Sequence, residues 1–132
     1  MAINVLIVDD SKVMRAMIKK TMEMSGLLLG EIRQAANGRE GIEALKEHWI
    51  DLAIVDINMP VMNGEEMIDS MHKDSDLKSI PIIVVSTEGS RTRIENLEHK
   101  GVKFIHKPFS PEIIRDTVND ILRTGESDEG TA

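Results

Sequence analysis

The stretch Ile54-Val55-Asp56-Ile57-Asn58-Met59-Pro60, with Gly64 shortly after it, organises the rest of this chain. A short apolar run ends in one carboxylate, and the proline and glycine then shape a loop. An aspartate stabilises a strand poorly, but at the edge of a sheet its carboxylate reaches solvent and ligands. We therefore interpret Asp56 as a nucleophile for phosphoryl groups, presented by a strand over residues 52–55.

Four further segments predict strands, at residues 3–8, 31–35, 80–85 and 102–105. Continuous apolar runs such as the first are typical of parallel strands that are covered on both faces. Helices are predicted between the strands by apolar residues at helical spacing, for example after a Ser11 cap, and a last helix begins near Ser110. Strands that alternate with helices predict an α/β fold, a doubly wound five-stranded parallel sheet with five helices.

One domain is expected over residues 1–124, because a chain of 132 residues can bury a single core. Residues 125–132 are almost entirely Gly, Ser, Thr, Asp and Glu, which predicts a disordered acidic tail. The chain contains no cysteine, no apolar run long enough for a membrane span and no signal-peptide pattern. A cytoplasmic monomer without membrane insertion is the simplest expectation.

The charge balance argues against a nucleic-acid-binding module. The chain has 16 basic and 23 acidic residues and a net charge of −7, whereas affinity for nucleic acid comes from Lys and Arg at phosphates. The aromatic residues are Trp49, Phe104 and Phe109 only, too few for a stacking platform. We therefore expect no nucleic acid among its partners.

Polar side chains interrupt the ends of four predicted strands. Asp9 and Asp10 follow the first strand, and Asp56 ends the third. Ser86 ends the fourth strand, and Lys107 follows the fifth. In doubly wound folds, ligands bind outside the carboxyl ends of the strands, where these residues would gather. Each has an ordinary explanation alone, such as helix-dipole charges for the first pair, but their joint occurrence predicts a site.

Three carboxylates in one crevice repel each other, by about 4 kcal/mol for a pair at 4 Å and an effective dielectric constant near 20. Lys107 offsets part of this repulsion, and Mg²⁺, which prefers oxygen ligands, offsets more. The four scattered histidines are better explained as surface residues than as a zinc site. An ionised aspartate needs no general base to attack phosphorus. It needs only positioning and groups that neutralise the charge of the phosphoryl oxygens. Asp10 and Asp56 would hold the metal ion, and Lys107 and Ser86 would contact the oxygens.

These motifs resemble the response-regulator receiver domain in its stand-alone, CheY-like form. The matching pieces are Val-Asp-Asp-Ser at 8–11, Asp56 with Asn-Met-Pro at 58–60, Gly64, Ser86 and Lys107-Pro108-Phe109. The resemblance covers residues 3–123 and implies a flavodoxin-like fold with strand order 2-1-3-4-5.

The resemblance also implies a role for each site residue. Asp56 would be the phosphoacceptor, supplied by a histidine kinase or a small phosphodonor. Asp9, Asp10, Asp56 and the backbone carbonyl of Asn58 would arrange Mg²⁺, and Lys107 would contact the phosphoryl group beside a cis bond to Pro108. Ser86 would move toward the phosphoryl oxygen and let Phe104 turn inward. That would remodel the face formed by the fourth helix, fifth strand and fifth helix, where partners dock.

The chain departs from the family pattern at two positions. Phe104 replaces a common Tyr and so lacks a hydroxyl, and Thr87 stands where Ala or Gly is common and would restrict access of the phosphodonor. Asn58 and Glu88 occupy the positions that tune the phosphoryl lifetime in this family, and their polarity is compatible with a short-lived state.

Two enzyme-like or cofactor-binding alternatives remain to be weighed against a switch. A haloacid-dehalogenase-like phosphatase needs a second Asp two residues after the nucleophile, and Asn58 in that position cannot transfer a proton. A flavodoxin-like FMN carrier needs a Ser/Thr/Gly-rich phosphate loop after the first strand, where Asp9 and Asp10 would repel phosphate. We expect no catalysis beyond the protein's own phosphoryl transfer and dephosphorylation.

A receiver without a further domain would pass its signal to another protein. The chain ends after the fifth predicted helix, so we expect the signal to pass by binding, most simply to a flagellar motor switch protein in chemotaxis. The alternative is a phosphorelay intermediate that passes its phosphoryl group to a histidine phosphotransfer protein.

Overall fold

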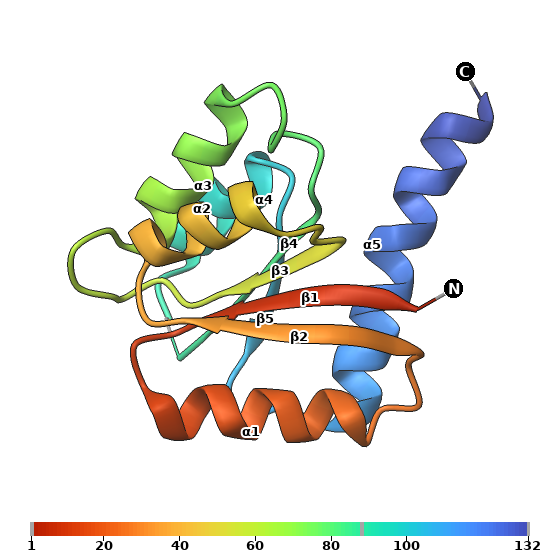
Figure 1. The fold of residues 1–132 in the computed structure, drawn as a ribbon, viewed down its shortest axis with the longest axis horizontal. Coiled ribbons are helices and arrows are strands. Elements are labelled where there is room, and N and C mark those ends of the chain that lie inside the picture. Colours follow the sequence, from red (N-terminus) through yellow and green to blue (C-terminus); the bar gives the residue numbers. More distant parts are fainter. Residues whose placement is uncertain (1, 88, 132) are drawn as a thin grey trace.

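The computed structural model describes the backbone of residues 2–87 and 89–131 and the side chains of residues 2–87 and 89–123. Strands and helices alternate along the chain (Figure 1): β1 (Ile3–Val8), α1 (Lys12–Glu23), β2 (Leu29–Ala35), α2 (Gly38–Glu47), β3 (Leu52–Val55), α3 (Gly64–Lys73), β4 (Ile82–Ser86), α4 (Arg91–His99), β5 (Lys103–His106) and α5 (Pro111–Thr131). All strand pairs are parallel, in the order β2-β1-β3-β4-β5. The predicted fold and strand order are confirmed.

Two apolar layers explain why the strands read as continuous apolar runs. In β1, Val5 and Ile7 belong to the layer that contains residues of α1 and α5, whereas Leu6 and Val8 belong to the layer beneath α2, α3 and α4. Figure 1 shows α1 on one side of the sheet and α2, α3 and α4 on the other. Because successive side chains of a strand point to opposite faces, both halves of the run are buried.

Helix ends follow the local sequence signals. The Ser11 hydroxyl accepts a hydrogen bond from the Met14 N–H at 3.1 Å, as its predicted capping role requires. Asn63 and Glu66 form a capping box at the start of α3. Gly26 and Gly101, predicted to end helices, have φ angles of +86° and +87°, which favour glycine. The caps at Ser11 and Asn63 set where the loops after β1 and β3 end, whereas the two glycines begin the loops that lead to β2 and β5.

The second strand begins two residues earlier than predicted. Gly30 interrupts the apolar pattern, but it allows the Asn4 side chain to approach, since a Cβ there would lie 2.3 Å from Asn4 Oδ1. That oxygen accepts the Glu31 N–H at 2.9 Å, where the pairing of β1 and β2 changes register. The glycine therefore belongs to the strand pairing.

The last helix continues past the predicted end of the domain at residue 124. Its backbone is helical through Thr131, and no proline after Pro111 interrupts it. The side chains beyond residue 123 and the final residue lie outside the described part of the chain, so disorder of the acidic tail stays a prediction. No helix within the described residues is both long and apolar enough to span a membrane.

Candidate metal and phosphoryl site

Sheet hydrogen bonds position the two central carboxylates. The Asp9 N–H donates to the Ala35 carbonyl at 3.1 Å, and the Asp56 N–H donates to the Val8 carbonyl at 2.9 Å. Both residues directly follow a strand, β1 and β3, which are neighbours in the sheet. The parallel sheet therefore places the two aspartates next to each other at its carboxyl edge.

Asp9 is almost fully buried, with 1% of its surface exposed. Its Oδ1 accepts the Ser11 N–H at 2.9 Å, and its Oδ2 lies 3.1 Å from the Lys107 Nζ. The same ammonium lies 3.9 Å from Asp56 Oδ1, and both of these side chains are 13% exposed. One lysine thus faces two carboxylates in a largely water-excluded position, where charge interactions are weakly screened.

Backbone contacts place Lys107 at this position. Its N–H donates to the carbonyl of Ser86 at 3.0 Å, which ties the end of β5 to the end of β4. The Lys107–Pro108 peptide bond is cis, as the resemblance implied. The lysine therefore reaches the carboxylates from the fifth strand.

Asp9, Asp10 and Asp56 each offer an oxygen atom that lies within 4.8 Å of the others. Burial raises the pKa of Asp56, Lys107 lowers it, Asp9 raises it further, the Ile57 N–H lowers it, and Asp10 adds a smaller increase. The net pKa lies above the ordinary value because one ammonium does not compensate burial and two further carboxylates. A set of carboxylate oxygens with this excess of negative charge fits a hard divalent cation such as Mg²⁺.

A close backbone approach holds the loop after β3. The Gly64 N–H donates to the Ile57 carbonyl at 2.8 Å, and a Cβ at Gly64 would lie 2.3 Å from the backbone oxygen of Asp56. Val61, in the same loop, has a φ of 68°, which is strained for a β-branched residue. The loop therefore has one required glycine and one strained residue close to the nucleophile candidate.

The other predicted site residues lie around this cluster. Ser86 is the last residue of β4 and is 1% exposed. Phe104 is half-buried against the layer beneath α2 to α4, with its ring centroid 4.8 Å from that of His106. Asn58 is exposed, and its Oδ1 lies 3.5 Å from Arg93 Nη1. The contacts in the structure join Asp9, Asp56 and Lys107, while the switching roles of Ser86 and Phe104 stay predictions. Glu88 lies outside the described residues.

Two arginines near the site were not found from the sequence. Arg15 Nη1 donates to the backbone carbonyl of Asp9 at 2.7 Å, and its Nε donates to Gln34 Oε1 at 3.1 Å. Arg93 contacts the loop after β3. Both helices carry several basic residues at exposed positions, so no local pattern distinguishes these two from solvent-facing charges.

A small apolar cleft of about 240 Å³ adjoins the site. Its lining includes Lys107 and Thr87 together with Met14, Met17 and Phe109. Thr87 is exposed at its edge, and its predicted effect on access of a phosphodonor is not tested by this geometry.

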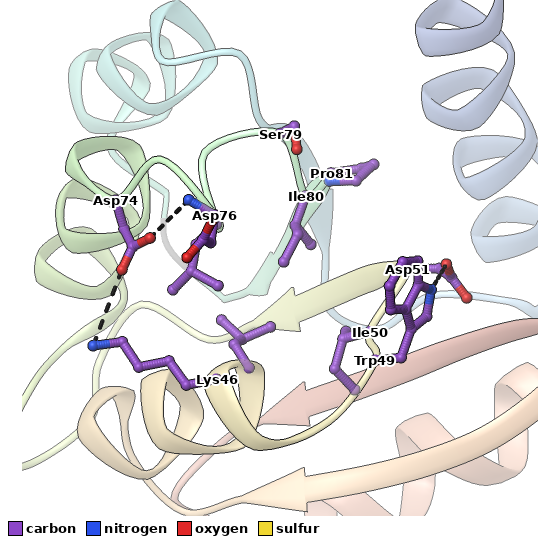
Figure 2. Close-up of a pocket in the computed structure, with 11 residues that line it drawn as sticks. Lys46, Trp49, Ile50, Asp51, Asp74, Asp76, Ser79, Ile80 and Pro81 are labelled. Carbon is purple, nitrogen blue, oxygen red and sulfur yellow. Dashed lines mark hydrogen bonds and ion pairs between the residues drawn. The ribbon is translucent and has the colours of Figure 1, made fainter.

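A larger cavity, of about 830 Å³, lies at the opposite edge of the sheet. It is lined by the end of α2, the segment before β3 and the segment before β4, and none of the predicted site residues is part of its lining. Figure 2 shows Lys46 and Asp74 at one end of this cavity and Trp49 and Asp51 at the other. Size alone therefore does not indicate the site.

Comparisons with known proteins agree with this geometry. Residues 5–119 match the family described as the response regulator receiver domain. A Chemotaxis protein CheY homolog from Campylobacter jejuni is 36% identical over 129 residues, which are 96% of this chain and 97% of the relative. Chemotaxis protein CheY1 from Helicobacter pylori is 35% identical, covering 92% of this chain and 98% of the relative.

Solved structures give the same result. The structure of Vibrio cholerae chemotaxis protein CheY4 is 33% identical, covers 92% of this chain and 99% of its own, and superposes with a TM-score of 0.79. A CheY-like receiver domain protein from Methanospirillum hungatei is 26% identical, covers 97% of this chain and 99% of its own, and has a TM-score of 0.82. The matched span, the sequence identities and the shared fold show that this chain belongs to the response regulator receiver domain family.

Proposed function

We propose that this protein is a single-domain response regulator in which Asp56 accepts a phosphoryl group from a histidine kinase. The main observation that supports this proposal is the cluster at the carboxyl edge of the sheet. Oxygens of Asp9, Asp10 and Asp56 lie within 4.8 Å of one another, and the Lys107 ammonium lies 3.1 Å from Asp9. The family membership supports the same proposal, since receiver domains act in two-component signalling.

In the proposed reaction a carboxylate oxygen of Asp56 attacks phosphorus. The new bond is an acyl phosphate, and the bond from phosphorus to the donor's imidazole nitrogen, or to the leaving carboxylate of acetyl phosphate, breaks. The Lys107 ammonium neutralises negative charge on the phosphoryl oxygens from the side of β5, and the Ser86 hydroxyl donates a hydrogen bond to one of these oxygens. The reaction needs little more than positioning and charge neutralisation.

Asp9, Asp10, Asp56 and the backbone carbonyl of Asn58 would hold Mg²⁺. When bound, the ion supplies the positive charge that the carboxylates lack and stabilises the phosphoryl oxygens. Without it, a negatively charged phosphodonor approaches three carboxylates that Lys107 alone offsets. Phosphorylation should therefore depend on the metal ion.

The proposed output is a change in the face formed by α4, β5 and α5. Ser86 would move toward the phosphoryl group, and the half-buried Phe104 would turn inward, which alters the surface offered to a partner. The relatives are named as chemotaxis proteins, so we place this protein in chemotaxis, in the cytoplasm, with a flagellar motor switch protein as partner. Neither the site nor the relatives named above favours the phosphatase or phosphorelay alternative.

The decisive experiment incubates the protein with acetyl phosphate and measures intact mass with Mg²⁺ or with EDTA. We expect one phosphoryl group on the wild type with Mg²⁺, and none with EDTA or on the Asp56→Asn variant. The Asp51→Asn variant is the control, because it changes an aspartate at the opposite edge of the sheet. Phosphorylation of Asp56→Asn would overturn the proposal.

A second experiment tests the output. Beryllofluoride-treated protein is immobilised and exposed to purified motor switch protein. Separately, protein phosphorylated with acetyl phosphate and freed of the donor is mixed with a purified histidine phosphotransfer protein. Binding of the first supports a role in motor control, whereas phosphoryl transfer to the second would replace that role with the relay.

A further inference from the structure

Helix α4 is weakly anchored by apolar contacts. Leu97 is its one fully buried residue, whereas α3 buries Gly64, Met67, Ile68 and Met71. A helix with so little buried apolar surface has a low local free energy of opening. Polar contacts therefore have unusual weight in fixing the position of α4.

Arg93, in the first turn of α4, makes such a contact with α3. Its Nη2 lies 2.5 Å from Glu65 Oε1, and its Nε lies 3.0 Å from the same oxygen. The two side chains are 30% and 32% exposed, so water screens the pair only in part. Two nitrogens on one carboxylate oxygen fix the plane of the guanidinium.

The fixed guanidinium also reaches the loop that carries the nucleophile. Its Nη1 lies 3.5 Å from Asn58 Oδ1, a long hydrogen bond to the residue two positions after Asp56. Glu65 is the second residue of α3, directly after Gly64, which contacts the backbone of Asp56. One arginine on the proposed output helix thus touches both ends of the loop between β3 and α3.

We propose that Arg93 is a positioning residue that couples α4 to the metal-binding loop through Glu65 and Asn58. The arginine holds the Asn58 backbone where its carbonyl can serve a metal ion, and the same contact keeps α4 in place. The inference rests on the proposed function, because it assigns the regulation of that site. This coupling is reciprocal: if the position of α4 changes the affinity of the loop for a metal ion, binding of the metal ion changes the stability of α4 by the same free energy. The same reciprocity holds for a phosphoryl group that moves the loop.

A second ion pair between the same elements provides a matched control. Lys100, which caps the end of α4, lies 2.7 Å from Asp69 of α3, with the two side chains 33% and 51% exposed. This pair links α4 to α3 about two turns along α4 and one turn along α3 from the Arg93–Glu65 pair. If Arg93 acted only as a structural tie, loss of either pair would have the same consequences.

The experiment compares Arg93→Gln and Glu65→Gln with Lys100→Gln, using three measurements. These are amide hydrogen exchange of residues 90–99 in metal-free protein, Mg²⁺ affinity by calorimetry, and the lifetime of the phosphoryl group after acetyl phosphate is removed. Loss of a partly exposed ion pair changes an equilibrium constant by about threefold. We expect the exchange rate to change by about this factor in all three variants. Mg²⁺ affinity and phosphoryl lifetime should change by this factor only in Arg93→Gln and Glu65→Gln.

The charge-swapped double variant, Arg93→Glu with Glu65→Arg, should restore the exchange protection of α4. Equal Mg²⁺ affinity and phosphoryl lifetime in Arg93→Gln and Lys100→Gln would overturn the coupling, even if both variants lose stability. A wild type that is never phosphorylated would refute the proposed function instead, while exchange and Mg²⁺ affinity would still test the contact.

Discussion

The two edges of the sheet carry similar residues but use them differently. At the carboxyl edge, Asp9 and Asp56 face each other and share one lysine. At the amino edge, Asp51 accepts the Asn4 N–H at 2.8 Å and the Trp49 indole N–H at 3.2 Å, and Asp74 accepts the Asp76 N–H at 2.8 Å. The two carboxylates of the second group line the larger cavity, but they lie at its opposite ends and accept different N–H donors. Carboxylates with separate donors are structural, whereas carboxylates that crowd around one cation are available for a ligand.

This difference can be tested most strongly at Lys107. In Lys107→Met, the buried Asp9 and the largely buried Asp56 lose their shared cation, and we expect the free energy of unfolding to fall by about 3 kcal/mol without metal. Lys46→Met is the matched change at the amino edge, where the lysine side chain is 60% exposed and its ammonium is 4.0 Å from Asp74, so the expected loss is below about 0.5 kcal/mol. Urea denaturation of both variants in EDTA measures the difference, and equal losses would contradict the proposed contrast.

Gly64 provides the second test, because it carries the backbone contact behind Asp56. In Gly64→Ala the new methyl group meets the Asp56 backbone oxygen, so the loop must shift, at a cost of about 2 kcal/mol. Gly89→Ala is the control, since nothing lies within 4 Å of a Cβ at that position. Thermal unfolding should separate the two variants by several degrees, and a slower phosphorylation of Gly64→Ala should accompany the loss.

The carboxyl edge could be predicted from the sequence because its signals are local. Each buried parallel strand is a continuous apolar run, so a polar residue at its end, such as Asp56 or Ser86, stands out without any structure. Topology then brings these ends together. The contacts of Arg93 could not be predicted, since it lies among other charged residues on α4 and its partners come from α3 and the loop. The cavity at the amino edge was also missed, because it forms between three segments without a common motif.

Asp56 itself should have opposite effects on stability with and without metal. Its pKa is raised in the folded state by burial and by Asp9 and Asp10, so the ionised carboxylate destabilises the metal-free fold, and stability is lost as the pH rises from the ordinary pKa through the folded-state pKa. Asp56→Asn should therefore stabilise the metal-free protein at pH 7 by on the order of 1 kcal/mol. Below the ordinary pKa of an aspartate, near 3.8, the advantage should disappear.

The control for this pH dependence is added Mg²⁺. A ligand that binds only the native state stabilises it by mass action, so the metal ion should stabilise the wild type more than Asp56→Asn and reverse their order at pH 7. Urea titrations at several pH values, in EDTA and in Mg²⁺, measure both effects. A wild type that is more stable than Asp56→Asn in EDTA at pH 7 would contradict the charge excess inferred for the site.

The smallest expected effect belongs to Trp49, at the amino edge. Its side chain is 81% exposed, and Asp51 keeps the Asn4 N–H on its other oxygen when the indole is removed. Trp49→Ala should change the free energy of unfolding by less than about 0.5 kcal/mol and leave the phosphorylation rate with acetyl phosphate unchanged. Asp51→Ala should cost more, about 1 kcal/mol, because the part-buried Asn4 N–H then lacks its acceptor. A slower phosphorylation of Trp49→Ala would mean that the two edges are coupled through the sheet, and the division between a structural edge and a chemical edge would be wrong.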